Sequence, residues 1–140
     1  MYYAFPADSS FQTFLKKVQE YHTEYCFVMC TFVGCYATLV AKQRYLQARL
    51  NEHIPLLVID AHTSVKIYHH LMQSFPKLFM HQKLPTHICF KKSVDDLTQR
   101  ITLQPILCNQ TIFGDRHFDQ LRALIREQDA LEKMQGVTSY

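Results

Sequence analysis

The order of hydrophobic and polar residues predicts a helix and then a buried strand at the start of the chain. Apolar residues recur with helical spacing over 10–22, and Ser9 and Gln12 just before them have the spacing of a capping box. The segment that follows, EYCFVMCTF at 24–32, is apolar on both alternations. Such a pattern is typical of a strand that is covered on both faces, so we expect this strand to be central in a sheet.

The same alternation of helix and strand continues through the middle of the chain. Residues 36–53 contain neither Gly nor Pro, are rich in helix formers and repeat apolar residues near a 3.6 period, so they predict a long second helix. IPLLVID at 54–60 predicts a second strand, and 63–75 predicts a third helix that Pro76 ends. Strand–helix–strand units predict neighbouring parallel strands with right-handed connections.

The last third predicts a hairpin and a closing helix. LPTHICF at 84–90 and LTQRITL at 97–103 have strand character and are separated by the polar turn KKSVDD. Helical spacing returns over 116–134, and a polar tail follows from about residue 134. The predicted order is helix, strand, helix, strand, helix, strand, strand, helix. We therefore expect an α/β domain with a mixed four-stranded sheet and helices on both of its faces.

Composition narrows the class of protein. A chain of 140 residues with 48% hydrophobic residues has the size of one domain over 1–140. A net charge of +3 and the lack of an aromatic-basic sheet motif disfavour direct binding of nucleic acid. No segment reaches the ~18 continuous apolar residues of a membrane span, and the first ten residues lack the features of a signal peptide. We expect an intracellular protein, cytoplasmic or nuclear, that does not bind membranes.

The candidate chemistry lies mainly in the cysteines. The chain has five, an odd number among hydrophobic neighbours, which favours buried thiols over a disulfide framework. Cys26 and Cys30 share one face of the predicted strand and are expected in the core. The eight histidines lack metal-ligand spacing, and no nucleophile or phosphate-loop motif occurs, so we expect neither a metal nor a cofactor. Asp60, at a strand end, is either a buried acid or a carboxylate that caps the following helix.

Three segments of the chain resemble the thioredoxin fold. They are CTFVGCY at 30–36, LLVID at 56–60 and LPTHICFKK at 84–92, and the resemblance covers roughly 10–132. It implies a three-layer α/β/α domain. In the family a cis proline faces the redox turn, and Pro85 occupies that place here, so we expect the Leu84–Pro85 bond to be cis.

The resemblance also implies that the dithiol of the family is missing. The family carries Cys-Gly-Pro-Cys at the start of the long helix, and alignment of TFVGC to it puts Phe32 at the attacking cysteine and Cys35 at the second. Cys30 is expected inside the strand, too far to replace the missing thiol. A spliceosomal branch of the family has also lost the first cysteine. It is similar in its YYAFP start, in a lone cysteine that opens the long helix and in an insertion like LQPILCNQTIFGD at 103–115. The chain departs from it in a longer segment at 74–83 and in lacking acidic residues beside the cysteine.

These observations lead to two hypotheses. The first is a non-catalytic protein-interaction or scaffold subunit of a multi-subunit assembly, with a spliceosomal complex as one candidate. The second is an atypical thiol oxidoreductase or redox sensor that uses Cys35, with Cys30 or a cysteine of a partner to resolve it. The simpler interpretation of Cys35 is a small apolar remnant of the lost pair. The alternative to an exposed patch at Phe32, Val33 and Tyr36, with equal weight, is that the segment 74–83 covers these residues. The predicted interaction surface consists of Phe32, Val33, Gly34, Tyr36, Pro85 and Thr86.

Overall fold

The computed structural model describes residues 1–79, 84–109 and 114–138, and within them the chain forms four α-helices and a five-stranded sheet. The predicted α/β class is confirmed. In chain order the elements are β1 (Tyr2–Ala4), α1 (Phe11–Glu20), β2 (Tyr25–Thr31), α2 (Tyr36–Gln47), a 3-10 helix (Leu50–Glu52), β3 (Leu56–Asp60), α3 (Val65–Ser74), β4 (Thr86–Val94), β5 (Ile101–Asn109) and α4 (Asp115–Thr138).

The sheet is mixed, with the strand order β1-β3-β2-β4-β5. β2 is central, as its apolar pattern predicts: Phe27 lies beside Leu56 of the parallel β3 on one side and beside Cys89 of the antiparallel β4 on the other. β1 extends the parallel part of the sheet and β5 the antiparallel part. Every residue of β2 is buried.

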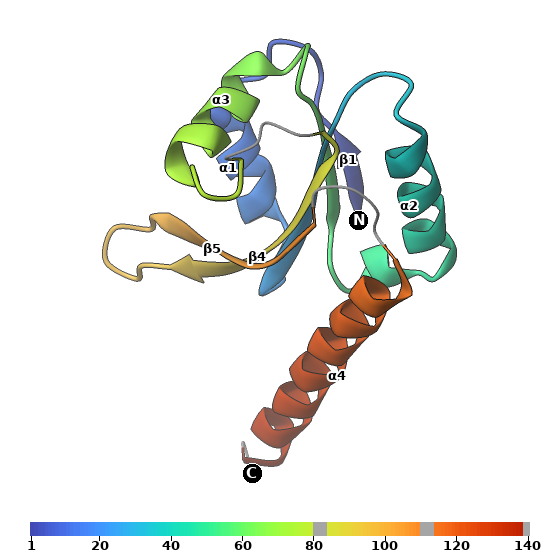
Figure 1. Cartoon of the computed structure of the whole chain (residues 1–140). Coiled ribbons are helices and arrows are strands. Elements are labelled where there is room, and N and C mark those ends of the chain that lie inside the picture. The colour runs from blue at the N-terminus through green and yellow to red at the C-terminus, as the bar shows by residue number, and fades with distance from the viewer. Residues whose placement is uncertain (80–83, 110–113, 139–140) are drawn as a thin grey trace.

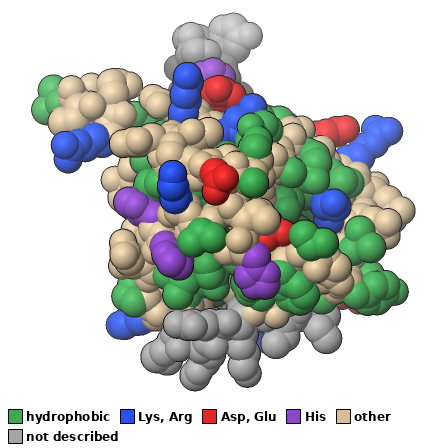
Figure 2. All heavy atoms as spheres, turned by 90° about the horizontal axis from the view of Figure 1, so that it is seen from above, with side chains coloured by type: hydrophobic (Ala, Val, Ile, Leu, Met, Phe, Trp, Pro, Cys, Tyr) green, Lys and Arg blue, Asp and Glu red, His purple; other side chains and the backbone are tan. Residues whose placement is uncertain are grey.

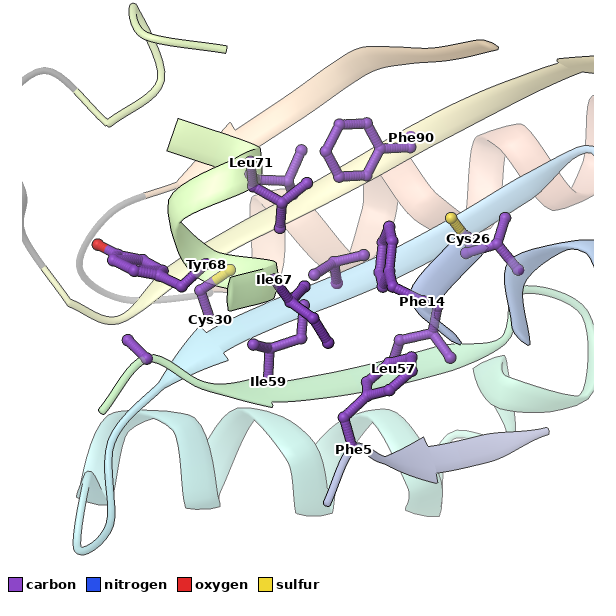
Figure 3. Close-up of a cluster of buried hydrophobic side chains, with 14 of the residues drawn as sticks. Phe5, Phe14, Cys26, Cys30, Leu57, Ile59, Ile67, Tyr68, Leu71 and Phe90 are labelled. Atoms are coloured by element: carbon purple, nitrogen blue, oxygen red, sulfur yellow. The ribbon is translucent and has the colours of Figure 1, made fainter. Parts of the chain in front are cut away.

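Two helices cover each face of the sheet (Figure 1). α1 and α3 pack on one face and α2 and α4 on the other, and each pair closes its own hydrophobic cluster, here called the α1/α3 core and the α2/α4 core. Alternate residues of β2 enter the two cores. Cys26 and Cys30 lie in the α1/α3 core beside Phe14, Ile67 and Leu71 (Figure 3). The prediction that both thiols are core residues is confirmed.

The edge strand β1 was not predicted, and the described sheet has five strands rather than four. Three residues are too few to show an alternation of apolar and polar positions. The strand forms because Tyr3 lies beside Leu57 of β3 and the Phe5 N–H donates to the Val58 carbonyl at 3.0 Å. Phe5 then enters the α1/α3 core.

The predicted capping box is wrong. Ser10, not Ser9, caps α1, and its hydroxyl accepts a hydrogen bond from the Thr13 N–H at 3.1 Å. The Ser9 hydroxyl instead donates to the Pro6 carbonyl at 2.7 Å. Both serines have the chemistry of an N-cap, so the path of the chain before the helix decides between them.

The ends of α2 and α4 also differ from the predictions. α2 ends at Gln47 rather than His53, because Arg49 adopts a left-handed conformation with φ of 56° and the 3-10 helix follows. α4 continues to Thr138, through the segment predicted to be a polar tail from about residue 134. Residues 48–53 are mostly good helix formers, so propensity does not show that α2 stops before them. The end of α4 is the opposite case, because the helix runs through Gly136 in spite of its low helix propensity.

The hairpin is longer than predicted. β4 continues through Val94, so most of the polar segment 91–96 belongs to the strand, and the turn lies where the Asp95 N–H donates to the Arg100 carbonyl at 2.9 Å. β5 takes in much of 103–115, which the sequence predicted as an insertion. Polar residues can occupy a strand where it extends past the core, and here the hairpin projects beyond the helices (Figure 1).

Candidate functional site

The candidate site is the turn between β2 and α2, at the top of the molecule in Figure 1, which is the side from which Figure 2 is viewed. β2 ends at Thr31, and α2 begins after Cys35, which is its N-cap residue. The Cys35 N–H donates to the Phe32 carbonyl at 3.1 Å, which closes the turn. Gly34 has φ of 85°, a left-handed conformation that a residue with a side chain rarely adopts.

Cys35 lies at the helix N-terminus, the place where the resemblance puts the attacking thiol. The alignment to the family puts Phe32 at that thiol and Cys35 at the second. In the structure Phe32 lies in the turn, before the helix begins, and Cys35 is the residue at the helix N-terminus. The residue one helical turn after Cys35 is Thr38.

The surroundings of Cys35 favour its thiolate form. The side chain is only 9% exposed, and this burial raises the pKa of the thiol. The hydroxyl and N–H of Thr38, the hydroxyl of Thr31 and the N–H of Ala37 act in the opposite direction, and together they hold the pKa below its ordinary value. No hydrogen bond of ordinary geometry caps α2 through the sulfur, so these donors act as dipoles near it.

Thr38 and His87 form a buried polar pair beneath the start of α2. The Thr38 hydroxyl lies 3.2 Å from His87 Nε2, which links α2 to β4. Burial and the nearby His117 lower the pKa of His87 to about 4, so its imidazole is neutral at pH 7. Sequence reasoning did not select either residue. No sequence signal marks them, because the period of apolar residues in this helix places Leu39 and Val40, not Thr38, on the inward side.

Cys30 does not serve the site. It is fully buried in the α1/α3 core, whereas α2 covers the opposite face of the sheet. Burial raises the pKa of Cys30 to about 12, so the thiol stays protonated at neutral pH. Cys30 thus faces the side of the sheet opposite to α2, a position that disfavours it as the resolving thiol for Cys35.

A hollow of about 260 Å³ lies beside Cys35. Phe32 is half-buried in its wall and lies 6.1 Å from the His62 ring, measured between ring centroids. Val33 and Tyr36 are 85% and 77% exposed. The full lining is Thr31, Phe32, Gly34, Cys35, Tyr36, Thr38, Leu39, Lys42 and Val58.

Pro85 and Thr86 do not belong to the exposed part of the predicted surface. The Leu84–Pro85 bond is cis, as the resemblance implied. Both residues are buried, and Thr86 lies beside Cys30 in the sheet. They present no area for a partner, and the exposed part of the predicted surface is reduced to Val33, Gly34 and Tyr36, with Phe32 at its edge.

The segment 74–83 leaves Val33 and Tyr36 uncovered as far as its described residues extend. Phe79 is buried in the α1/α3 core against Tyr68, with ring centroids 5.6 Å apart. Phe75 packs on Phe90 in the same core. Residues 80–83 lie outside the described part, as do 110–113 of the predicted insertion.

The remaining candidate features of the sequence are Asp60, metal-binding side chains and membrane-spanning segments. Asp60 Oδ1 accepts from the N–H groups of His62 at 2.8 Å and Thr63 at 3.2 Å, the helix-entry role that was one of its two interpretations. Over the described ranges, His, Cys, Asp and Glu side chains form no group of three that could hold a metal ion. None of the helices described here has the length and apolar character needed to cross a membrane.

Comparison with known proteins does not assign the chain to a family. No model of a known protein family matches the sequence, and no curated protein matches it significantly. The residues of the site are therefore the basis on which a function is argued.

Proposed function

We propose that the chain is a thioredoxin-like domain that works as a non-catalytic protein-interaction or scaffold subunit of a larger assembly. The proposal is supported by the helix-covered mixed sheet, by the β4–β5 hairpin and by the cysteine that opens α2, all of which the resemblance implies. It is supported further by the position of Cys30, which lies in the α1/α3 core rather than beside α2.

The orientation of α2 carries the proposal. The helix buries Thr38, Ala41 and Tyr45, while Tyr36, Leu39 and Val40 are exposed. A helix that packs only on its own domain normally turns its larger apolar side chains inward and its threonine outward. α2 does the opposite in its first turns, directly beside the exposed Val33. Apolar side chains gathered at one place on a surface are characteristic of a protein-binding site.

Copurification from the natural source tests this function. Tagged protein is compared with the double variant Val33→Asp, Tyr36→Asp, which places charges in the exposed apolar surface without touching either core. We expect specific partners with the unchanged protein and their loss with the double variant. Leu97→Asp is the matched control, because Leu97 is equally apolar and 95% exposed but lies between β4 and β5. Partners retained by the double variant would exclude the turn as the binding surface.

A ribonucleoprotein assembly is the candidate that the resemblance suggests. The same purification distinguishes it. Subunits of such an assembly would appear together with their RNA, and would survive nuclease treatment if the contact is made by protein. Loss of all partners after nuclease treatment would show that RNA links the chain to the assembly.

Thiol chemistry at Cys35 is the second candidate function, favoured by the lowered pKa of this thiol. The Cys35 thiolate would attack a disulfide of a substrate, forming a new S–S bond to one sulfur and releasing the other as a thiol after it takes up a proton. A thiol of the substrate or of a second molecule would then release the product, because Cys30 cannot reach the mixed disulfide.

The rate of Cys35 alkylation against pH tests the second function. In Thr38→Val the side chain keeps its size but loses the hydroxyl that favours the thiolate, so the midpoint of the profile should move to higher pH. Peptide mass spectrometry assigns the modified cysteine, and a disulfide-reduction assay on the same samples measures turnover. An inert Cys35 and no turnover would reject this function and leave the first.

A further inference from the structure

The hollow beside Cys35 has the size of a single anchoring side chain. Its volume of about 260 Å³ lies below the roughly 300–1,000 Å³ of ordinary cofactor and small-molecule pockets. Phe32, Leu39 and Val58 contribute apolar walls, and Tyr36 lies at its rim with 77% of its surface exposed. Protein interfaces place their strongest contacts in such depressions, where one apolar side chain of the partner is desolvated.

The charge around the hollow has one sign. Lys42 is the charged residue of the lining, and its ammonium lies 5.7 Å from the centre of the Tyr2 ring without an ion pair to any described residue. α2 contains Lys42 and Arg44 and no acidic residue, and its N-terminus adds a positive partial charge. Arg44 is already paired with Asp115. Lys42 is thus the cation that remains for a partner.

The nearest acidic residue on the neighbouring strand does not cancel this charge. Asp60 follows Val58 on β3 by two residues, but its carboxylate accepts two backbone N–H groups of the turn into α3. A partner carboxylate at the rim would therefore meet an ammonium and the N-terminus of a helix. Such complementary charge at the rim would orient the incoming segment and favour acidic partners over basic ones.

We propose that the hollow receives an apolar side chain from an acidic segment of a partner protein, and that a carboxylate beside this side chain pairs with Lys42. The inference rests on the proposed docking function and adds the chemical class of the partner. Two contacts define the expected segment: an aromatic or aliphatic residue for the hollow and an Asp or Glu next to it for the cation.

Selection from a displayed library of random dodecapeptides tests the proposal on the full chain. Peptides are selected on the unchanged protein and depleted on Tyr36→Asp. The survivors are synthesised and titrated by fluorescence polarisation. We expect them to share an acidic residue adjacent to a large apolar one. Lys42→Glu should weaken their binding at least tenfold, and Lys66→Glu, the same charge change on the exposed side of α3, should leave it unchanged.

Three other results are possible, and they reject the acidic partner, the docking function or the protein nature of the partner. Peptides that depend on Tyr36 but show no acidic residue, and that bind Lys42→Glu as well as before, would reject the acidic partner and keep the docking surface. No peptide that depends on Tyr36 would reject the docking function itself. A uridine decanucleotide that binds through Tyr36 and Lys42 when no peptide does would replace the protein partner by single-stranded RNA.

Discussion

The buried polar pair Thr38 and His87 lies where the packing of α2 on the sheet and the chemistry of Cys35 depend on the same residue. Thr38 contributes to the α2/β4 contact through the 3.2 Å interaction with His87, and its hydroxyl and N–H also favour the Cys35 thiolate. A buried hydroxyl and a buried imidazole each lose water on folding, so the contact between them offsets part of that loss. One residue thus joins the packing of α2 to the chemistry of the turn.

His87 should make the domain less stable in acid. Its pKa is lowered from 6.5 in the unfolded chain to about 4 in the fold, so the unfolded chain binds the extra proton between these values. The stability of the fold with a neutral His87 is therefore complete above pH 6.5, and it falls as the pH drops toward 4 because protonation favours the unfolded chain. Between pH 7 and pH 5 the unchanged protein should lose about 2 kcal/mol more than His87→Leu.

Urea unfolding at the two pH values measures this difference. His69→Leu is the matched control, because it removes an exposed histidine of α3. His87→Leu also loses the contact with Thr38, so the change with pH, rather than the stability at one pH, is the informative quantity. Equal losses in the unchanged protein and in His87→Leu would show that His87 does not carry the acid sensitivity.

The cysteines show how position decides thiol chemistry. Burial in the α1/α3 core raises the pKa of Cys26 and of Cys30 to about 12. Cys35 is also largely covered, yet the donors at the start of α2 lower its pKa. The spacing along the chain does not distinguish these thiols, since the distinction arises from which groups surround each sulfur.

At the scale of elements, one lysine links the hairpin to the first helix. Lys92 of β4 donates from Nζ to the carbonyls of Val18 at 2.9 Å and Tyr21 at 2.5 Å, near the C-terminal end of α1. Lys92 is half-buried, and this burial lowers the pKa of its ammonium. The ammonium donates to carbonyls at the end of α1, where the helix itself supplies no N–H partners. The contact ties two elements that are far apart in the sequence.

Lys92→Met should therefore destabilise the domain by about 2 kcal/mol, because a hydrogen bond from a charged donor contributes roughly 1.5–3 kcal/mol. Lys91→Met is the matched control on the same strand. Lys91 pairs with Glu24 at 3.3 Å, but both side chains are partly exposed, and such a pair contributes at most about 1 kcal/mol. Thermal unfolding of both variants measures the difference, and equal midpoints would contradict the assigned role of Lys92.

The same hairpin shows why element boundaries were the weakest predictions. Lys91 and Lys92 were predicted to lie in a polar turn, but both belong to β4. A sequence pattern cannot show that Lys91 pairs with Glu24 and that Lys92 donates to the Val18 carbonyl. The start of α2 was predicted correctly, at Tyr36, but its end was not, because Arg49 leaves the helical conformation within a run of helix formers. The central strand was predicted correctly, because burial on both faces leaves a continuous apolar pattern.

At the scale of the molecule, the sheet separates two cores that share β2 as their common layer. Side chains that alternate along β2 enter opposite cores, so a thiol on one side cannot reach a thiol on the other. This arrangement confines the proposed chemistry and binding to one end of the α2/α4 side. The short edge strand β1 completes the other side by carrying Phe5 into the α1/α3 core.

Phe5→Ala should cost about 3–5 kcal/mol, as is usual when a phenylalanine is removed from a core. Phe5 is buried and its ring centroid lies 5.5 Å from that of Phe14. Tyr2→Ala is the control, because Tyr2 lies in β1 just before Phe5 and is 41% exposed, and it should change stability little. Chemical denaturation measures both. A small effect of Phe5→Ala would mean that the N-terminal strand is not part of the cooperative unit.

The pattern of apolar residues was enough to predict the alternation of helices and strands, the start of α2, the central place of β2 and the core positions of Cys26 and Cys30. These follow from the period of apolar residues, which is a property of neighbours along the chain. The contact of Thr38 with His87 and the outward orientation of the apolar residues in the first turns of α2 became visible only in the folded chain. Each of these depends on contacts between segments distant in the sequence, and a local pattern does not contain them.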